Sequence, residues 1–176
     1  MMNELNEFWA NSIDEAIRKA RAQGREDVAD YLSLKATNDE IRAASCRWLF
    51  ESLLEIAHEA MREKGLNLKI ENENPYRFEM NKATMVGSLL EFKFGIRRLS
   101  AEAGWTRTPQ DGFMRGGALA FARLVHFGQA KHNAELMLIR PKDSAPQWFS
   151  LDRAGSRTPF DSNNLREHFK IFLGII

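Results

Sequence analysis

The hydrophobic period of this chain changes at Gly65 from the spacing of a helix to the spacing of a strand. Over residues 38–65 the apolar positions recur at intervals of three and four, which predicts one long amphipathic helix. Immediately afterwards Leu66, Leu68 and Ile70 alternate with polar residues, which is typical of a strand with one buried face. The chain is therefore expected to place its helices first and its strands second.

Two more helices are expected before the long one. Residues 3–23 carry an apolar stripe at helical spacing that ends at Gly24, and a shorter helix is expected over residues 25–35. The polar residues 37–39 would then form the corner into the long helix. The apolar stripe of the first helix consists of Leu5, Phe8, Trp9, Ile13, Ala16, Ile17 and Ala20.

The second half of the chain predicts a series of short strands. After a turn at residues 72–75, residues 76–80 are expected to form a short return strand. The alternation is most regular over residues 90–97. Beyond Arg98 the apolar set moves from even to odd positions, which predicts either a β-bulge near Arg97 and Arg98 or a tight turn between two strands.

Turn-forming residues separate the later strands, and Asp161 or Ser162 can cap a final helix. The later strands are expected over residues 118–127, 134–139, 147–152 and 157–160. Helices, then consecutive strands, then a helix indicate an α+β fold. We expect a three-helix layer over residues 1–65 packed on an antiparallel meander of five to seven strands over residues 66–160, with a C-terminal helix over residues 161–176.

Composition places the chain among ordinary globular proteins. Of its 176 residues, 44% are hydrophobic and 28% are charged, so we expect a single domain over residues 1–176. No apolar run reaches about 18 residues, and the first ten residues carry Glu4 and Glu7 instead of a basic segment, so neither a transmembrane helix nor a signal peptide is expected. The single cysteine, Cys46, is expected to be a buried apolar side chain. These features favour a cytoplasmic protein without a membrane partner.

Charge is distributed unevenly along the chain. Residues 1–84 hold 12 lysine and arginine residues against 16 acidic ones, whereas residues 85–176 hold 13 against 8. The net charges of −4 and +5 place any anion-binding surface in the second half. Nucleic-acid binding through that half is one alternative function, although the sequence contains no basic tail.

One long loop, over residues 106–117, interrupts the strands. Because each antiparallel strand reverses direction, this loop and the loop at residues 141–146 should leave the sheet at the same end. An arginine-rich loop suits anion binding, because the guanidinium donates two parallel hydrogen bonds to a carboxylate or phosphate. The expected binding residues are Trp105, Arg107, Phe113, Arg115 and Lys142.

Two interpretations of this loop remain open. In the first, its arginines and aromatic residues bind an anionic small molecule, peptide or protein, and the chain is a non-catalytic binding or adaptor domain. In the second, Trp105, Phe113 and Met114 pack against the core and both arginines are solvated. A homodimer is also expected, because an open meander leaves a sheet edge that must be paired or protected.

Patterns of catalysis and metal binding are weak. His126, His132 and Glu135 are zinc-ligand types, but their spacing is not that of a zinc site and no further ligand follows at a recognisable interval, so no metal or other cofactor is expected. Glu91 and Lys93 resemble the E-x-K half of the PD-(D/E)XK nuclease pattern, in which carboxylates hold Mg²⁺ and the lysine orients water. The upstream aspartate of that pattern is missing. A nuclease-like enzyme is therefore the less favoured alternative, and a charged pair on an exposed strand face accounts for both residues.

Overall fold

The computed structural model describes the backbone of residues 2–175 and, apart from residues 2–6 and 9, their side chains. The expected apolar residues Leu5 and Trp9 therefore lie outside the described side chains. The chain forms two compact units, residues 1–44 and 45–176. Among the described residues, no helix has the length and apolarity needed to span a bilayer. The expected single domain stays a prediction.

The first unit is a pair of helices. Helix α1 (Met2–Ala22) and the beginning of α2 (Glu26–Lys64) are joined by a turn in which Gly24 has a φ of 70°, a conformation that glycine adopts without strain. Their shared core has four buried members among the side chains that the structure describes. It consists of the buried residues Ile13, Ile17, Ala20 and Ala29.

The prediction of three N-terminal helices is wrong, because α2 runs without a break from Glu26 to Lys64. The expected corner at residues 37–39 is helical. The Thr37 hydroxyl donates to the carbonyl of Ser33 at 3.1 Å, and Asp39 pairs with Arg42 at 2.7 Å. Partners three and four residues away along the helix satisfy these polar side chains, so they do not need a turn.

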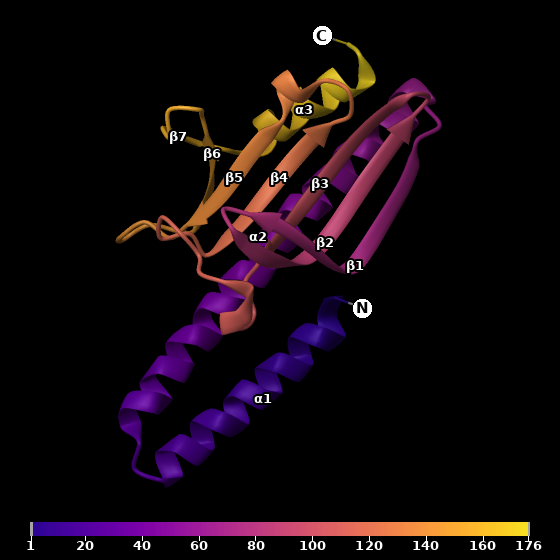
Figure 1. Ribbon diagram of the computed structural model, residues 1–176. Helices are drawn as coiled ribbons and strands as arrows, with labels where there is room; N and C mark the ends of the chain where they lie inside the picture. The colour runs from indigo at the N-terminus through magenta and orange to yellow at the C-terminus, as the bar shows by residue number, and fades with distance from the viewer. Residues whose placement is uncertain (1, 176) are drawn as a thin grey trace. The chain divides into compact units, whose positions relative to one another are not determined.

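The second unit contains the sheet, which is shown in Figure 1. All seven strands are antiparallel and follow one another in sequence order, which confirms the predicted α+β fold and meander. Their bounds are β1 Lys69–Met80, β2 Ala83–Phe94, β3 Arg97–Trp105, β4 Ala120–His126, β5 Ala134–Ile139, β6 Gln147–Leu151 and β7 Arg157–Pro159. The C-terminal helix α3 (Ser162–Leu173) is also confirmed, and Asp161 caps it by accepting from the backbone N–H groups of Asn163 and Asn164.

The first hairpin differs from the prediction. Residues 69–80 form one strand, and its turn lies at Asn81 and Lys82, whose φ angles of 53° and 62° are those of a two-residue hairpin turn. At the expected turn, β1 has a register shift between Glu73 and Tyr76 relative to β2. This is a bulge with one extra residue in β1. Proline suits a bulge in an edge strand because it has no N–H to donate to a ladder.

Of the two alternatives predicted near Arg97, the tight turn is confirmed, slightly earlier in the chain. Phe94 pairs with Arg97, so Gly95 and Ile96 are the two turn residues, and Gly95 has a φ of 59°. The alternation over residues 90–97 predicts that Ile96 shares a strand face with the apolar residues at 90, 92 and 94. Ile96 is instead 95% exposed at the tip of the turn.

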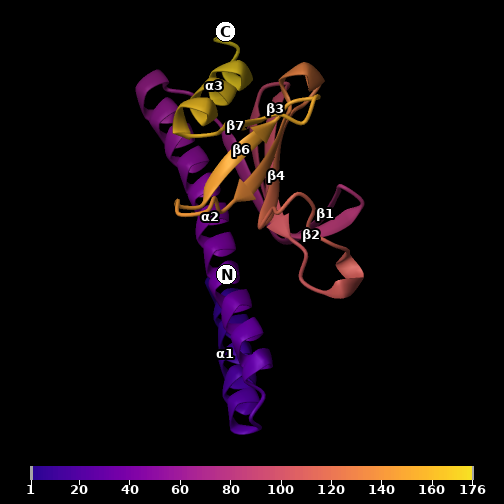
Figure 2. The ribbon, with the colours of Figure 1, turned by 90° about the vertical axis from the view of Figure 1, so that its left-hand side faces the viewer.

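The main core lies between the sheet and two helices, the 45–64 part of α2 and α3 (Figure 2). The Trp148 indole N–H donates to the carbonyl of Ser45 at 3.2 Å, and Arg166 of α3 pairs with Glu59 of α2 at 2.8 Å. The helical side chains buried in this core are Cys46, Leu49, Phe50, Leu53, Ile56, Ala57, Ala60, Leu165, Phe169 and Phe172.

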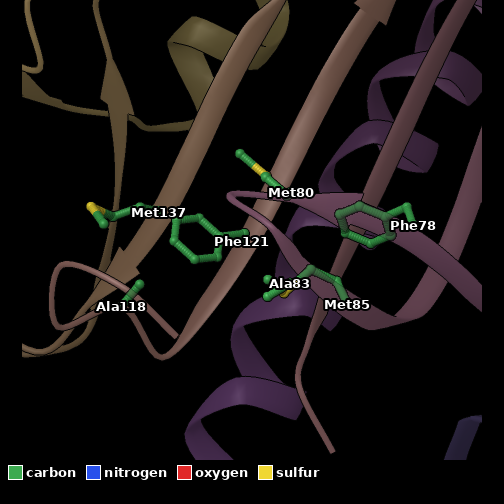
Figure 3. Packing of buried hydrophobic residues seen from close by; sticks show 7 residues of the cluster. All are labelled: Phe78, Met80, Ala83, Met85, Ala118, Phe121 and Met137. Atoms are coloured by element: carbon green, nitrogen blue, oxygen red, sulfur yellow. The ribbon is translucent and has the colours of Figure 1, made fainter. Parts of the chain in front are cut away.

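A second apolar cluster lies on the other face of the sheet. In β2 the buried positions change from odd, at Ala83 and Met85, to even, at Leu90 and Phe92, so this strand contributes to both cores. The alternation in the sequence predicts strands with one buried face, so this second buried face was not predicted. Figure 3 shows the cluster, which brings the end of the first hairpin together with β4, β5 and Ala118, two residues before β4. Its buried members are Phe78, Met80, Ala83, Met85, Ala118, Phe121 and Met137.

Glycines at the centre of the sheet permit this second core. Gly87 of β2 pairs with Gly104 of β3. A β-carbon on Gly87 would overlap the carbonyl oxygen of Ala103, and one on Gly104 would meet the Val86 carbonyl at 2.6 Å. The strands bend here, and Figure 2 shows the turn end of the β1–β2 hairpin leaving the plane of the sheet on the side opposite α3.

Candidate functional site

Three connections leave the sheet at the same end: the β1–β2 turn, the β3–β4 loop and the β5–β6 loop. Antiparallel order requires this arrangement, and it agrees with the sequence-based placement of residues 106–117 and 141–146. The backbone N–H of Leu119, at the end of the β3–β4 loop, donates to the carbonyl of Leu138 at 2.8 Å. The β3–β4 loop therefore lies beside the strand that leads into the β5–β6 loop.

The first two predicted site residues, Trp105 and Arg107, contact each other. Trp105 is buried at the end of β3, and the Arg107 guanidinium lies over its ring with Cζ 3.6 Å from the centroid. Arg107 also donates from Nε and Nη2 to the carbonyl of Val86, at 3.3 and 3.1 Å. The cation–π contact and these bonds fix Arg107 against the sheet.

Asp111 anchors the same part of the loop. It lies at the end of a single 3₁₀ turn, η1 (Pro109–Asp111), and is buried. Its Oδ2 accepts from the backbone N–H groups of Arg107 and Thr108, at 2.9 and 3.1 Å, and its Oδ1 accepts from Arg77 at 2.8 Å. The backbone bond from Arg107 is the main reason that the pKa of this carboxyl lies below its usual value.

The later part of the loop is held against the second apolar cluster. Met114 packs on that cluster, and Ala118 is one of its buried members. Arg157 of β7 donates to the carbonyl of Gly116 at 3.0 Å. Gly116 has a φ of 67°, and a β-carbon there would come within 2.9 Å of the Met137 methyl group. The loop is therefore fixed at both of its ends.

Between these anchors the loop exposes two predicted site residues. Phe113 is 83% exposed, although its neighbours Gly112 and Met114 are partly buried. Arg115 is also exposed, and no hydrogen bond or ion pair engages its guanidinium within the described chain. Lys142, in the β5–β6 loop at the same end, is exposed as well. The structure thus divides the five predicted residues into two that support the loop and three that face solvent.

Each of the two sequence-based interpretations describes a part of this loop. Trp105 and Met114 pack inward, as in the second interpretation, and Arg115 is solvated. Phe113 does not pack inward, and Arg107 is not solvated. The partners Arg77 and Val86 could not be predicted from the pattern of the loop, because they lie on other strands.

The described residues include no group of three or more histidine, cysteine or acidic side chains placed to hold a metal. His126 instead contacts a histidine that the sequence did not connect with it. Its Nε2 lies 2.9 Å from Nδ1 of His168 on α3, and its ring centroid lies 6.0 Å from that of His132. Burial, followed by repulsion from these two histidines, lowers the pKa of His126 to about 4. Burial also lowers the pKa of His168. Both rings are thus neutral at physiological pH, and a shared hydrogen bond joins the sheet to α3.

Glu91 and Lys93 belong to a network of charges on strands β1 to β3. Lys93 contacts Glu91 at 3.1 Å and Glu71 at 2.9 Å. Glu91 also accepts from the Ser100 hydroxyl at 3.1 Å and lies 3.6 Å from Arg98. These contacts explain Glu91 and Lys93 as members of an ion-pair network. They do not supply the upstream aspartate that the nuclease pattern requires.

Another buried carboxylate lies deeper on the same face. Arg123 donates from Nε to Glu102 at 2.7 Å, and Glu102 is buried. Burial and the neighbouring Glu102 raise the pKa of Tyr76, so its phenol stays protonated at neutral pH. Glu102 thus has Arg123 and Tyr76 as hydrogen-bond partners beside the second apolar cluster. They have the character of a structural polar network, which the linear sequence did not indicate.

Comparison with known proteins gives no relative from which a function could be inferred, because no protein-family model, curated protein or solved structure matches this chain.

Proposed function

We propose that this protein is a binding or adaptor domain that engages an anionic ligand or protein partner through the exposed part of the β3–β4 loop. Phe113 supplies an apolar contact, and Arg115 and Lys142 supply charge. The observation that carries the proposal is an anchored loop that presents a large aromatic side chain, 83% exposed, two residues from an unpaired arginine. Such a loop loses little conformational entropy on binding.

The charge at this end of the sheet supports an anionic partner. The three connections, residues 81–82, 106–119 and 140–146, contain five lysine and arginine residues and two aspartates. One of these aspartates, Asp111, is buried and bound to Arg77. The local field therefore attracts anions, and it is strongest at low ionic strength.

A thermal-shift screen of anionic compounds tests the proposal. Inorganic phosphate, citrate, nucleotides and a glutamate-rich peptide are suitable probes, because they carry phosphate or carboxylate groups. We expect at least one of them to raise the melting temperature of the wild-type protein, since a ligand that binds only the folded state stabilises it. The Arg115→Ala variant should lose most of this shift while keeping its melting temperature without ligand.

Arg153→Ala is the matched control. Arg153 is an exposed arginine in the β6–β7 turn, at the opposite end of the sheet. The ligand-induced shift should be the same in Arg153→Ala and in the wild type. A shift that is unchanged in Arg115→Ala would contradict the proposal, and so would the absence of a shift with every anionic probe.

Nucleic-acid binding is a second candidate for the same loop. An exposed aromatic ring beside cations can stack on the bases of a single strand while the cations contact its phosphates. In that case a single-stranded oligonucleotide would bind, its affinity would fall steeply with salt, and Phe113→Ala would weaken it. Fluorescence anisotropy at two salt concentrations separates this function from the binding of a small anion or an acidic protein.

A homodimer through the sheet edge remains a prediction, and both edges have features that hinder strand pairing. The edge strand β1 contains a bulge and Pro75, and β7 has three residues and ends in Pro159. Size-exclusion chromatography with light scattering decides the question. A monomer at high micromolar concentration would exclude the homodimer.

A further inference from the structure

Exposed apolar side chains gather at the other end of the sheet, away from the β3–β4 loop. Ile96, in the β2–β3 turn, is 95% exposed. Phe127, directly after β4, is 62% exposed, and Ile175, two residues after the end of α3, is 49% exposed. Isolated exposed apolar residues are common, but three in adjoining segments require an explanation.

Contacts of two arginines place these three segments beside one another. Arg98 lies over the Phe127 ring, with Cζ 4.6 Å from the centroid, and its carbonyl accepts from the Phe127 N–H at 3.0 Å. Arg97, next to Ile96, donates to the carbonyl of Phe172 at 3.5 Å and lies against Gly174. Ile96 and Phe127 therefore adjoin Arg97 and Arg98, and Ile175 follows Gly174, which Arg97 contacts. We call these five residues, at one end of the sheet, the apolar–basic tip.

The charge of this end is positive. The β2–β3 turn with the first two residues of β3 (residues 95–98) and the connections at residues 127–133 and 152–156 contain four lysine and arginine residues and one aspartate. One of these arginines, Arg98, lies 3.6 Å from Glu91. The aspartate, Asp152, accepts from the backbone N–H of Ser156, as expected of a turn residue. Lys131 is exposed, and no ion pair engages it among the described residues.

We infer that the apolar–basic tip docks on a lipid bilayer that contains anionic headgroups. Ile96 and Phe127 would enter the boundary between headgroups and acyl chains, and Arg97, Arg98 and Lys131 would contact lipid phosphates and carboxylates. The combination matters, because stable surface binding of a protein to a bilayer normally needs both buried apolar area and attraction to anionic lipids. The site differs from the proposed binding loop in place and in ligand.

A bilayer fits this surface better than a folded protein partner does. The apolar residues project from turns, and Ile96 in particular is almost fully exposed at a hairpin tip. A stable protein interface needs about 800 Å² of complementary surface on each partner, with an apolar centre. A bilayer needs no such complementarity, because its interface accommodates single projecting side chains.

Co-sedimentation of the full chain with vesicles tests the inference. We expect the protein to bind vesicles of phosphatidylcholine with phosphatidylserine, and to bind vesicles of phosphatidylcholine alone much more weakly. Ile96→Ser should weaken binding to the anionic vesicles by about tenfold, because it removes the projecting apolar side chain. Lys131→Glu should weaken it by a similar factor at low salt, because it replaces attraction with repulsion.

Matched controls separate these effects from general ones. Leu34→Ser changes an apolar residue on α2 that is 58% exposed, and Arg47→Glu changes an exposed arginine of the same helix. Both should bind vesicles as the wild type does. All four substitutions are at exposed positions, so their melting temperatures should stay close to that of the wild type, which a thermal melt checks.

Three outcomes would overturn the inference. The first is no phosphatidylserine-dependent sedimentation at low salt. The second is binding that Lys131→Glu weakens and Ile96→Ser leaves unchanged, because attraction alone would then explain it. The third is binding of a glutamate-rich peptide that depends on Ile96 while vesicles do not bind, which would make the tip a protein-docking surface.

Discussion

At the scale of single residues, the β3–β4 loop depends most on Asp111. Asp111→Ala removes the acceptor for two backbone N–H groups and for Arg77, and should lower the free energy of unfolding by about 1–3 kcal/mol. Arg77→Ala should cost less than about 1 kcal/mol, because the Arg77 side chain is 62% exposed. Urea unfolding of both variants measures the difference, and equal losses would contradict the leading role of the backbone bonds.

The same carboxylate has a defined pH dependence. Because the folded-state pKa of Asp111 lies below its usual value near 3.8, its contribution to stability is present above that value and is lost as the pH falls through the lower folded pKa. The Asp111→Ala variant should therefore lose less stability than the wild type on acidification below pH 4.

Gly87 gives a second residue-scale prediction. Gly87→Ala should destabilise the protein by about 2 kcal/mol or more, because its β-carbon would overlap the Ala103 carbonyl of the adjacent strand. Gly95→Ala has open space for a β-carbon, so it should cost only about 1 kcal/mol, the penalty of its positive φ. Chemical denaturation compares the two variants. An equal loss of unfolding free energy in the two variants would mean that β2 and β3 can move apart without a large loss of stability.

The different roles of the two loop arginines could not be predicted from the sequence. The composition of the loop drew attention to Arg107 and Arg115 and assigned both the same role. What separates them is the position of Trp105 and of the Val86 carbonyl on neighbouring strands. Strand alternation predicts which face a side chain occupies, but it does not predict the partner that faces it across the sheet.

At the scale of elements, the His126–His168 contact joins α3 to β4. Because burial lowers both pKa values in the folded state, the pair contributes stability that is complete above the unfolded value near 6.5 and is lost as the pH falls. For His126, with a folded pKa of about 4, the loss between pH 7 and pH 4 should reach about 3 kcal/mol.

The double variant His126→Phe, His168→Leu tests this contribution. Its free energy of unfolding should depend less on pH between 7 and 4 than that of the wild type. His58→Gln is the control, because His58 is exposed on α2, and its pH dependence should match the wild type. A double variant with unchanged pH dependence would show that the buried histidines do not control acid stability.

The elements themselves were predictable where one period dominates. The antiparallel meander, the long helix and the capped C-terminal helix all follow from local patterns. The errors fell on residues 37–39 and 72–75, where polar residues and proline are typical of turns. In α2 these polar side chains find partners within the helix, and in β1 the proline lies at a bulge. Local composition does not distinguish a turn from either of these.

At the scale of the whole molecule, the two units differ in the size of their cores. Among the side chains that the structure describes, residues 1–44 bury four apolar ones in their cluster, whereas residues 45–176 contain two cores, one on each face of the sheet. Few buried contacts imply a low free energy of local opening. In hydrogen-exchange mass spectrometry, α1 should exchange well before β3 and β4. Equal protection would contradict this expectation.

The two ends of the sheet have different chemistry. One end presents Phe113, Arg115 and Lys142 on anchored loops, and the other presents the apolar–basic tip. Both arise from the same topology, because a meander places alternate connections at opposite ends. A ligand at one end can therefore be tested with substitutions at the other as controls.

The division of roles between the two loop arginines is the central claim, and one paired measurement tests it. Arg107→Ala and Arg115→Ala are compared for unfolding free energy in urea and for the thermal shift caused by the strongest anionic probe. We expect Arg107→Ala to lower the unfolding free energy by about 1–3 kcal/mol, because it removes the Trp105 and Val86 contacts, and to keep most of the ligand-induced shift. Arg115→Ala should leave the unfolding free energy within about 0.5 kcal/mol and abolish the shift. The reverse pattern, or loss of both properties in both variants, would contradict the account.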